Sequence, residues 1–228
     1  MVNQLHHSDI SHFIREVGNN AQVILDIGSR HSLEAVEFSK SLPESNVYCF
    51  EPNPDSYITC LENTKGYQNI EVFQIAASDK DGMISFFAID PDKTITSWFD
   101  GNLGASSMYK ANGSYPYEKY HQKEIEVEQK RIDTWCNECG IGEVDAVWMD
   151  VQGHALSCLE GFGDVLDTVR VIQVELEHRV IYEGQCLFPE VNDYLINKGF
   201  ILKRRMGENE WSGDYIYARI PNSNINME

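Results

Sequence analysis

Basic residues are scarce in this sequence of 228 residues, because 18 lysines and arginines stand against 36 aspartates and glutamates, giving a formal net charge of -18. So acidic a surface repels nucleic-acid phosphates and anionic lipid headgroups. We therefore expect no nucleic acid and no membrane among the partners of this protein.

Long apolar runs and targeting signals are also lacking. No run approaches the roughly 20 residues that a membrane-spanning helix requires. Residues 1–12 are polar and lack the basic and apolar regions of a secretory signal. No linker divides the chain, and its 42% hydrophobic content is enough for a buried core. We expect a soluble, cytoplasmic protein with a single domain over residues 1–228.

A second pair of closely spaced cysteines is missing too. Cys136 and Cys139 have the spacing of half a zinc site, but structural zinc requires two such pairs. The other cysteines are scattered, several of them in apolar segments where a thiol behaves as a small buried hydrophobe. We expect six reduced thiols and no zinc.

The sequence does contain a regular alternation of strands and helices. Three segments are almost continuously apolar, which is typical of strands buried on both faces of a parallel sheet: 23–27, 46–51 and 70–77. Apolar periodicity predicts helices at residues 8–17, within an N-terminal extension over residues 1–20, at residues 33–42, and after Pro54. In the last of these helices Ile58 and Leu61 are expected to face inward. An alternation of three parallel strands with two connecting helices places its ligand crevice at the carboxyl ends of the strands.

The second half of the chain alternates less regularly. Asp81-Gly82 is typical of a turn into a strand at residues 83–89. Strands are then predicted at 124–132, 144–151 and 169–176, and helices at 133–139, 156–162 and 190–198. The last two strands, 200–204 and 215–220, are expected to form an antiparallel hairpin at a sheet edge, and the tail 222–228 to be frayed.

Residues 90–122 show no regular pattern and are rich in Gly, Ser, Asn and Tyr. A loop this long inside a compact domain is usually functional or disordered. We expect a substrate loop, in which four tyrosines either stack on the substrate or anchor the loop: Tyr109, Tyr115, Tyr117 and Tyr120.

A candidate binding site follows the first strand, where residues 26–32 turn at Gly28 and begin a helix. Free backbone N–H groups at a helix start bind anionic groups. Glu51 ends the next strand, where an acidic residue reaches ribose hydroxyls in nucleotide-binding folds. The combination predicts a bound nucleoside that carries an anionic group. The alternatives are a plain turn and helix cap at Gly28 and Ser29, and a surface acid at Glu51.

Seven segments, in order along the chain, carry a family resemblance: Val23–Ser32, Tyr48–Pro54, Ala76–Gly82, Arg131–Trp135, Val147–Gly153, Val171–Leu176 and Leu195–Phe200. They resemble the FkbM family of S-adenosylmethionine-dependent methyltransferases. The resemblance covers nearly the whole chain after residue 20. It implies a Rossmann-like class I methyltransferase fold of the α/β class, with a mostly parallel seven-stranded sheet whose last strand is antiparallel.

The resemblance also implies S-adenosylmethionine as cofactor and a small-molecule acceptor, such as a hydroxyl on a sugar or natural product. It assigns the methionine part of the cofactor to Asp26, Gly28 and Ser29, the ribose to Glu51 with Asn53 nearby, the adenine to Ala77 and Ser78, and the region under the methyl donor to Asp150.

The sequence departs from the family pattern in its glycine loop and after Asp150. The usual Gly-Ala-Asn-x-Gly becomes Gly-Ser-Arg-His-Ser at residues 28–32, and the usual Glu, Gly, Ala and Glu become Gln, Gly, His and Ala at residues 152–155. Arg30 either pairs with the carboxylate of the cofactor or fills the pocket. We favour pairing, since a guanidinium can flank a helix start without covering it.

A hydroxyl acceptor requires a base, because the enzyme must align the acceptor with the activated methyl group and remove its proton. Asp150, His154 and Glu175 are the candidates, and Glu177 and His178 follow the same strand as Glu175. His154 is our first choice because an imidazole takes a proton near neutral pH. The alternative for His154 is a helix-start histidine bonded to backbone.

Other chemistry remains open at this site. Asp150 and Glu175 end adjacent strands, and oxygen ligands suit magnesium. A carboxylate that stabilises the methyl donor explains Asp150 as well, so we predict no metal. One alternative is an NAD-dependent oxidoreductase, which should show a fuller Gly-x-Gly-x-x-Gly loop than this sequence has after Gly28. Another is a non-catalytic binding module that kept the fold and lost the chemistry.

Overall fold

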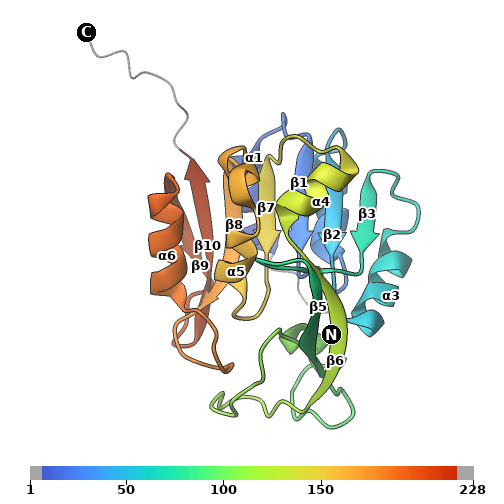
Figure 1. Cartoon of the computed structure of the whole chain (residues 1–228), viewed down its shortest axis with the longest axis vertical. Coiled ribbons are helices and arrows are strands. Elements are labelled where there is room, and N and C mark those ends of the chain that lie inside the picture. The colour runs from blue at the N-terminus through green and yellow to red at the C-terminus, as the bar shows by residue number, and fades with distance from the viewer. Residues whose placement is uncertain (1–6, 220–228) are drawn as a thin grey trace.

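The computed structural model describes residues 7–219, with side chains from Ile10 onward. A seven-stranded sheet lies at its centre (Figure 1) in the order β3-β2-β1-β7-β8-β10-β9. Its strands are β1 (Val23–Ile27), β2 (Asn46–Phe50), β3 (Ile70–Phe73), β7 (Ala146–Met149), β8 (Val171–Glu177), β9 (Phe200–Met206) and β10 (Ser212–Arg219). In this described sheet β10 runs antiparallel to both β8 and β9, and the other paired strands are parallel. The predicted fold class and the closing hairpin are confirmed.

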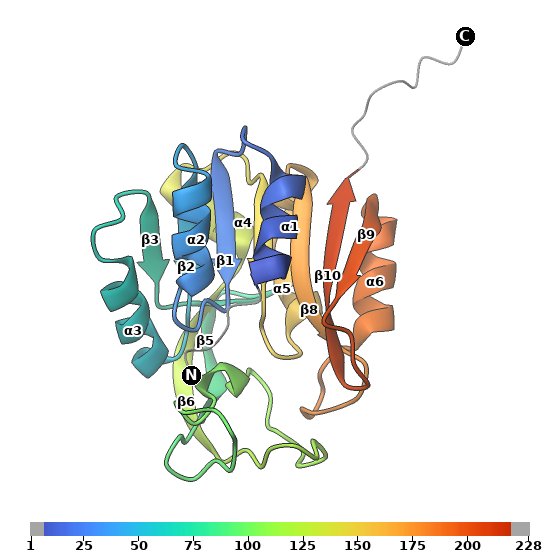
Figure 2. The ribbon, with the colours of Figure 1, turned by 180° about the vertical axis from the view of Figure 1, so that it is seen from behind.

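Helices cover both faces of the sheet, as the two opposite views show (Figures 1 and 2). They are α1 (His7–Val17), α2 (Leu33–Ser41), α3 (Pro54–Thr64), α4 (Ile132–Cys139), α5 (Ala155–Glu160) and α6 (Phe188–Asn197), with the short 3-10 helices η1 (Leu103–Ala105) and η2 (Gly163–Asp167). The helices α1 and α2 pack on one face, and α4, α5 and α6 on the other. No helix among the described residues is long and apolar enough to cross a membrane.

Successive residues of β1 belong to different cores, which explains its continuous apolar sequence. Ile24 packs into the core beneath α1 and α2, and Leu25 into the core beneath α4 to α6. In the second core the Trp135 ring lies edge-on to Phe50, with ring centroids 4.9 Å apart. Aromatic burial of this kind fixes the carboxyl end of β2, and with it Glu51.

A second sheet of three strands lies beyond the carboxyl ends of the parallel strands (Figure 1). It consists of β4 (Ala76–Ala77), β5 (Gly82–Ile89) and β6 (Gln122–Lys130) in the order β4-β6-β5. The prediction of one strand over residues 70–77 is therefore wrong. The chain leaves the main sheet after Phe73, and Ala76–Ala77 pairs with β6 instead.

The predicted inward face of α3 is also wrong. Ile58 is 55% exposed and Leu61 is 45% exposed. This helix contacts the backbone of the glycine loop. The Asn63 side-chain amide donates to the His31 carbonyl at 2.9 Å. Such a contact favours a polar face. The predictions for residues 1–6 and for the tail 222–228 lie outside the described residues.

Candidate active site

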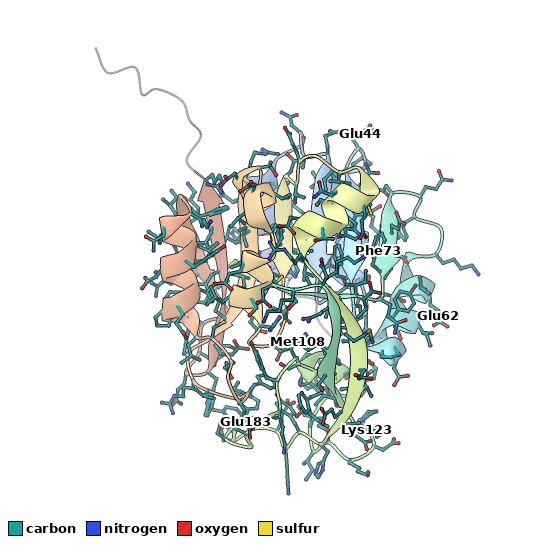
Figure 3. All side chains as sticks on the ribbon, in the orientation of Figure 1. Glu44, Glu62, Phe73, Met108, Lys123 and Glu183 are labelled. Atoms are coloured by element: carbon teal, nitrogen blue, oxygen red, sulfur yellow. The ribbon has the colours of Figure 1, made fainter. Side chains whose placement is uncertain are left out.

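Two adjoining cavities lie at the carboxyl ends of the parallel strands. The smaller encloses about 550 Å³, counting space open to solvent, and is bounded by the ends of β1 and β2 and by the second sheet. Met108, labelled in Figure 3, lies in its wall. The larger encloses about 1550 Å³, again counting space open to solvent, and is bounded by the ends of β1, β7 and β8 and by the segment 98–120. Gly28, Arg30, Gly104 and Asp150 line both cavities, so the two meet there.

The glycine loop brings β1 close to the end of β7. Gly28 has φ 81°, and its N–H donates to the Phe50 carbonyl at 2.9 Å. A Cβ at this position would lie 1.8 Å from the Asp150 carbonyl oxygen, so only glycine fits. Arg30 also has a positive φ, of 51°, a conformation that costs energy for a side chain of this size.

Asp26 is 1% exposed and lies in the wall of the larger cavity. Its Oδ2 has no hydrogen-bond partner among the described residues. Burial, and then repulsion by Glu34, raise the pKa of Asp26 well above its ordinary value. The adjacent Ser29 hydroxyl donates to the Asp26 carbonyl at 2.7 Å and stiffens the loop. A buried acceptor without a donor is costly, so Asp26 is suited to a ligand that brings an N–H group.

Glu51 is buried in the wall of the smaller cavity. Its Oε2 accepts from the Arg30 N–H at 2.7 Å, and its Oε1 accepts from the Asn53 N–H at 2.8 Å. Burial raises the pKa of Glu51 to about 7, and these two backbone bonds oppose the rise. Asn53 lines neither cavity, because its side chain caps α3 by accepting from the Asp55 N–H.

His154 immediately precedes α5 and faces the smaller cavity, with Ala77 in the same wall. Its Nε2 is hydrogen-bonded to the buried Ser78 hydroxyl, and its Nδ1 to the Tyr109 hydroxyl, both at 3.1 Å. Burial lowers the pKa of His154 to about 4, so the ring is neutral near pH 7. The His154 ring is thus hydrogen-bonded to Ser78 and Tyr109, while Asp150 lines the same cavity and Glu175 lines only the larger one.

Asp150 and Glu175 are brought together in the larger cavity by Gln152. The Gln152 Nε2 donates to Asp150 Oδ1 at 2.6 Å and to Glu175 Oε2 at 3.0 Å. The Tyr182 hydroxyl donates to Gln152 Oε1 at 2.9 Å. Burial raises the pKa of both carboxyl groups, and the neighbouring Asp150 raises that of Glu175 further. The sequence marked Gln152 only as a departure from the family pattern, and it gave no sign of Tyr182.

The described residues contain no group of three or more His, Cys, Asp or Glu side chains that could hold a metal ion. Between Asp150 and Glu175 lies the amide nitrogen of Gln152, a donor with no affinity for a cation. Cys136 is buried and Cys139 exposed, and both are free thiols.

Arg30 joins the glycine loop to the segment 90–122. Its Nη2 donates to Asp100 Oδ2 at 2.8 Å, and its guanidinium carbon lies 4.6 Å from the ring centroid of Trp98. The Arg30 Nε has no partner among the described residues. The expected pairing with the carboxylate of the cofactor remains a prediction for that nitrogen.

The four tyrosines of the segment 90–122 lie in different environments. Tyr115 and Tyr120 line the larger cavity, with ring centroids 6.0 Å apart in a stacked pair. Tyr109 contacts His154, and Tyr117 is 71% exposed. Two of the four are therefore in place to contact a ligand of the larger cavity.

Comparison with known proteins decides the family. Residues 16–202 match the family described as the methyltransferase FkbM domain. The chain belongs to the FkbM methyltransferase family. It is a methyltransferase that uses S-adenosylmethionine, as expected, and the NAD-dependent oxidoreductase alternative is wrong.

Two relatives and one solved structure place the enzyme among known methyltransferases. The 2-O-methyltransferase NoeI of Sinorhizobium fredii is 33% identical over 175 residues, 76% of this chain and 70% of the relative. The hexuronic acid methyltransferase AglP of Haloferax volcanii is 24% identical over 208 residues, 88% of this chain and 77% of the relative. M. capricolum TrmK, solved with S-adenosylhomocysteine, shares the fold with a TM-score of 0.53 at 11% identity, over 100% of this chain and 73% of that one.

Proposed function

We propose that this enzyme transfers the methyl group of S-adenosylmethionine to a hydroxyl group of a sugar. The observation that carries the proposal is the larger cavity beside Gly28 and Asp150, whose wall combines aromatic rings with carboxylates. Tyr115 and Tyr120 line this wall, where aromatic rings can pack against the C–H groups of a sugar, and carboxylates accept hydrogen bonds from its hydroxyls. The hexuronic acid relative supports a sugar acceptor.

The residues at the two cavities fit the cofactor. The unpaired Asp26 Oδ2 would accept from the amino group of its methionine part, beside Gly28 and Ser29. Glu51, fixed by two backbone N–H bonds, retains free lone pairs for ribose hydroxyls. The apolar wall that includes Ala77 would receive the adenine. Arg30 and Asp150, which line both cavities, would lie where the cofactor meets the acceptor.

The bound cofactor supplies a methyl group that is already activated for transfer. The protein must then hold the acceptor hydroxyl in line and receive its proton. We assign the proton to the carboxyl pair of Asp150 and Glu175, because both face the larger cavity. Gln152 holds this pair in place. His154 is a weaker candidate, since its pKa of about 4 leaves little driving force for taking a proton.

The net charge bears on the kind of acceptor, and the cysteines bear on the cellular compartment. A net charge of -18 opposes binding of RNA or an anionic membrane, so we infer a small acceptor. The six cysteines are free thiols, which supports a reducing compartment such as the cytoplasm.

Methyl transfer from labelled S-adenosylmethionine tests the proposal directly. The purified enzyme is incubated with a panel of hexose and deoxyhexose methyl glycosides, and label in the sugar is counted together with S-adenosylhomocysteine release. We expect transfer to at least one sugar and loss of about tenfold or more in Glu175→Gln. Transfer to RNA or protein, with none to any sugar, would contradict the proposal.

A further inference from the structure

The lining of the larger cavity contains many more acidic than basic side chains. Its lining includes seven carboxyl groups, namely Asp26, Glu34, Glu118, Asp150, Glu175, Glu177 and Asp214. Among the described lining residues the basic side chains are Arg30 and His31. Arg30 is paired with Asp100, and burial and the nearby Arg30 lower the pKa of His31, so little positive charge faces these carboxyl groups.

Much of the acidic wall comes from one face of β8. Alternate residues of a strand point the same way, and Gln173, Glu175 and Glu177 all line the larger cavity. Burial raises the pKa of Glu177 to about 8, and the nearby Asp150 adds to this effect. Additional negative charge would be unfavourable here, whereas a hydrogen-bond donor or a cation would be favourable.

Gln173 provides a second and independent indication that the ligand supplies hydrogen-bond donors. It is 1% exposed, and its Nε2 donates to Asp214 Oδ1 at 2.7 Å. Its Oε1 has no partner among the described residues. A buried acceptor of this kind requires a donor, so the molecule that fills the cavity must supply one.

A buried donor without a hydrogen-bond partner among the described residues, the Arg30 Nε, lies in the part of the wall that the two cavities share. The Arg30 Nε belongs to the junction with the smaller cavity, beside Gly28, where the carboxylate of the cofactor is expected. An anionic group on the acceptor would meet the unpaired Gln173 Oε1 and the carboxyl groups of Glu175 and Glu177 along β8.

We propose, building on the sugar methyltransferase function, that the acceptor is a neutral or amino-bearing sugar and not a uronic acid or sugar phosphate. Its hydroxyl or ammonium groups donate to Gln173 Oε1 and to the carboxyl groups of β8. The carboxylate of a uronate, or a phosphate group, brings only further acceptors and like charge to this wall, which selects against it. In this respect the enzyme differs from its hexuronic acid relative.

The test compares matched acceptors that differ only at C6 of the sugar: a hydroxymethyl, an aminomethyl and a carboxylate form of each methyl glycoside in the panel. We expect kcat/KM for the neutral and amino forms to exceed that for the uronate about tenfold or more. Equal or better use of the uronate overturns this inference and leaves the sugar methyltransferase function standing. Transfer to no form of any sugar overturns both.

A variant that removes an ionisable carboxyl group connects the preference to the cavity, and it is compared with the wild type at about pH 9, where Glu177 is ionised. Glu177→Gln keeps the shape of the side chain, and we expect it to raise the uronate-to-neutral ratio of kcat/KM severalfold. Glu183→Gln, an exposed position outside the cavity, is the matched control and should leave the ratio unchanged. An unchanged ratio in folded Glu177→Gln overturns the inference, and the wild-type comparison decides it if that variant does not fold.

Discussion

At the scale of single residues, pKa values separate the two candidate bases. His154 has its pKa lowered to about 4 by burial. Asp150 and Glu175 have theirs raised by burial, and Glu175 also by its charged neighbours. A base must lose its proton before it can act, so each candidate predicts a rise in activity at a different pH.

We predict that kcat/KM rises with pH through a pKa well above the ordinary carboxyl value, because the pair of Asp150 and Glu175 must ionise. Glu175→Gln should remove this rise and lower kcat/KM about tenfold or more. His154→Ala should keep the rise and the affinity for the cofactor, and reduce turnover by a smaller factor. Steady-state rates between about pH 5 and 9 measure this, with Glu183→Gln as control.

The opposite pattern would restore His154 as the base. It would consist of an intact pH profile in Glu175→Gln together with abolished turnover and unchanged cofactor affinity in His154→Ala.

At the scale of elements, the segment 90–122 is fastened over the larger cavity by Arg30. We predict that Asp100→Asn, which loses the ion pair and keeps the side-chain shape, raises the acceptor KM severalfold and speeds amide exchange around η1. Asp92→Asn, at an exposed position of the same segment, should change neither. Unchanged KM and exchange in Asp100→Asn would show that the ion pair does not hold the segment.

The main sheet was predictable because its strands are buried on both faces, which leaves a continuous apolar run such as that around Leu25. The second sheet was not, because β4 has two residues and its pairing with Lys130 depends on a contact between distant parts of the sequence. The face of α3 was misassigned because Ile58 and Leu61 have helical spacing, whereas the helix packs through polar contacts with the glycine loop.

Some residues of the candidate site could likewise be predicted from the sequence, and others could not. Asp26 and Glu51 could be placed from sequence because each ends a buried strand, and parallel strands bring such ends to one edge. The functions proposed for Gln152 and Gln173 depend on which partners their amide atoms find or lack in the folded chain. No spacing in the sequence carries that information.

At the scale of the whole molecule, buried acids make stability depend on pH. Burial raises the pKa of Glu51 to about 7 and that of Glu177 to about 8, from ordinary values of 4.5. The native state then binds more protons than the unfolded chain, so the free energy of unfolding falls as pH rises through this range. His154 acts in the opposite direction, but only as pH falls below its ordinary pKa of 6.5.

We predict a lower thermal midpoint for the unliganded protein at about pH 8.5 than at about pH 6.5, by several degrees. Glu177→Gln should show a smaller decrease, because an amide does not titrate. Thermal unfolding followed by circular dichroism in matched buffers measures both. A midpoint that rises over this interval, or an undiminished decrease in Glu177→Gln, would contradict the assignment of buried acids.

The central claim is that the cofactor lies across the junction of the two cavities, between Asp26 and Glu51, while the acceptor occupies the wall formed by β8. Titration calorimetry with S-adenosylhomocysteine tests it most directly. We predict binding to the wild type, affinity reduced about tenfold or more in Asp26→Asn and in Glu51→Ala, and unchanged affinity in Glu177→Gln. Full affinity in both Asp26→Asn and Glu51→Ala would contradict the claim.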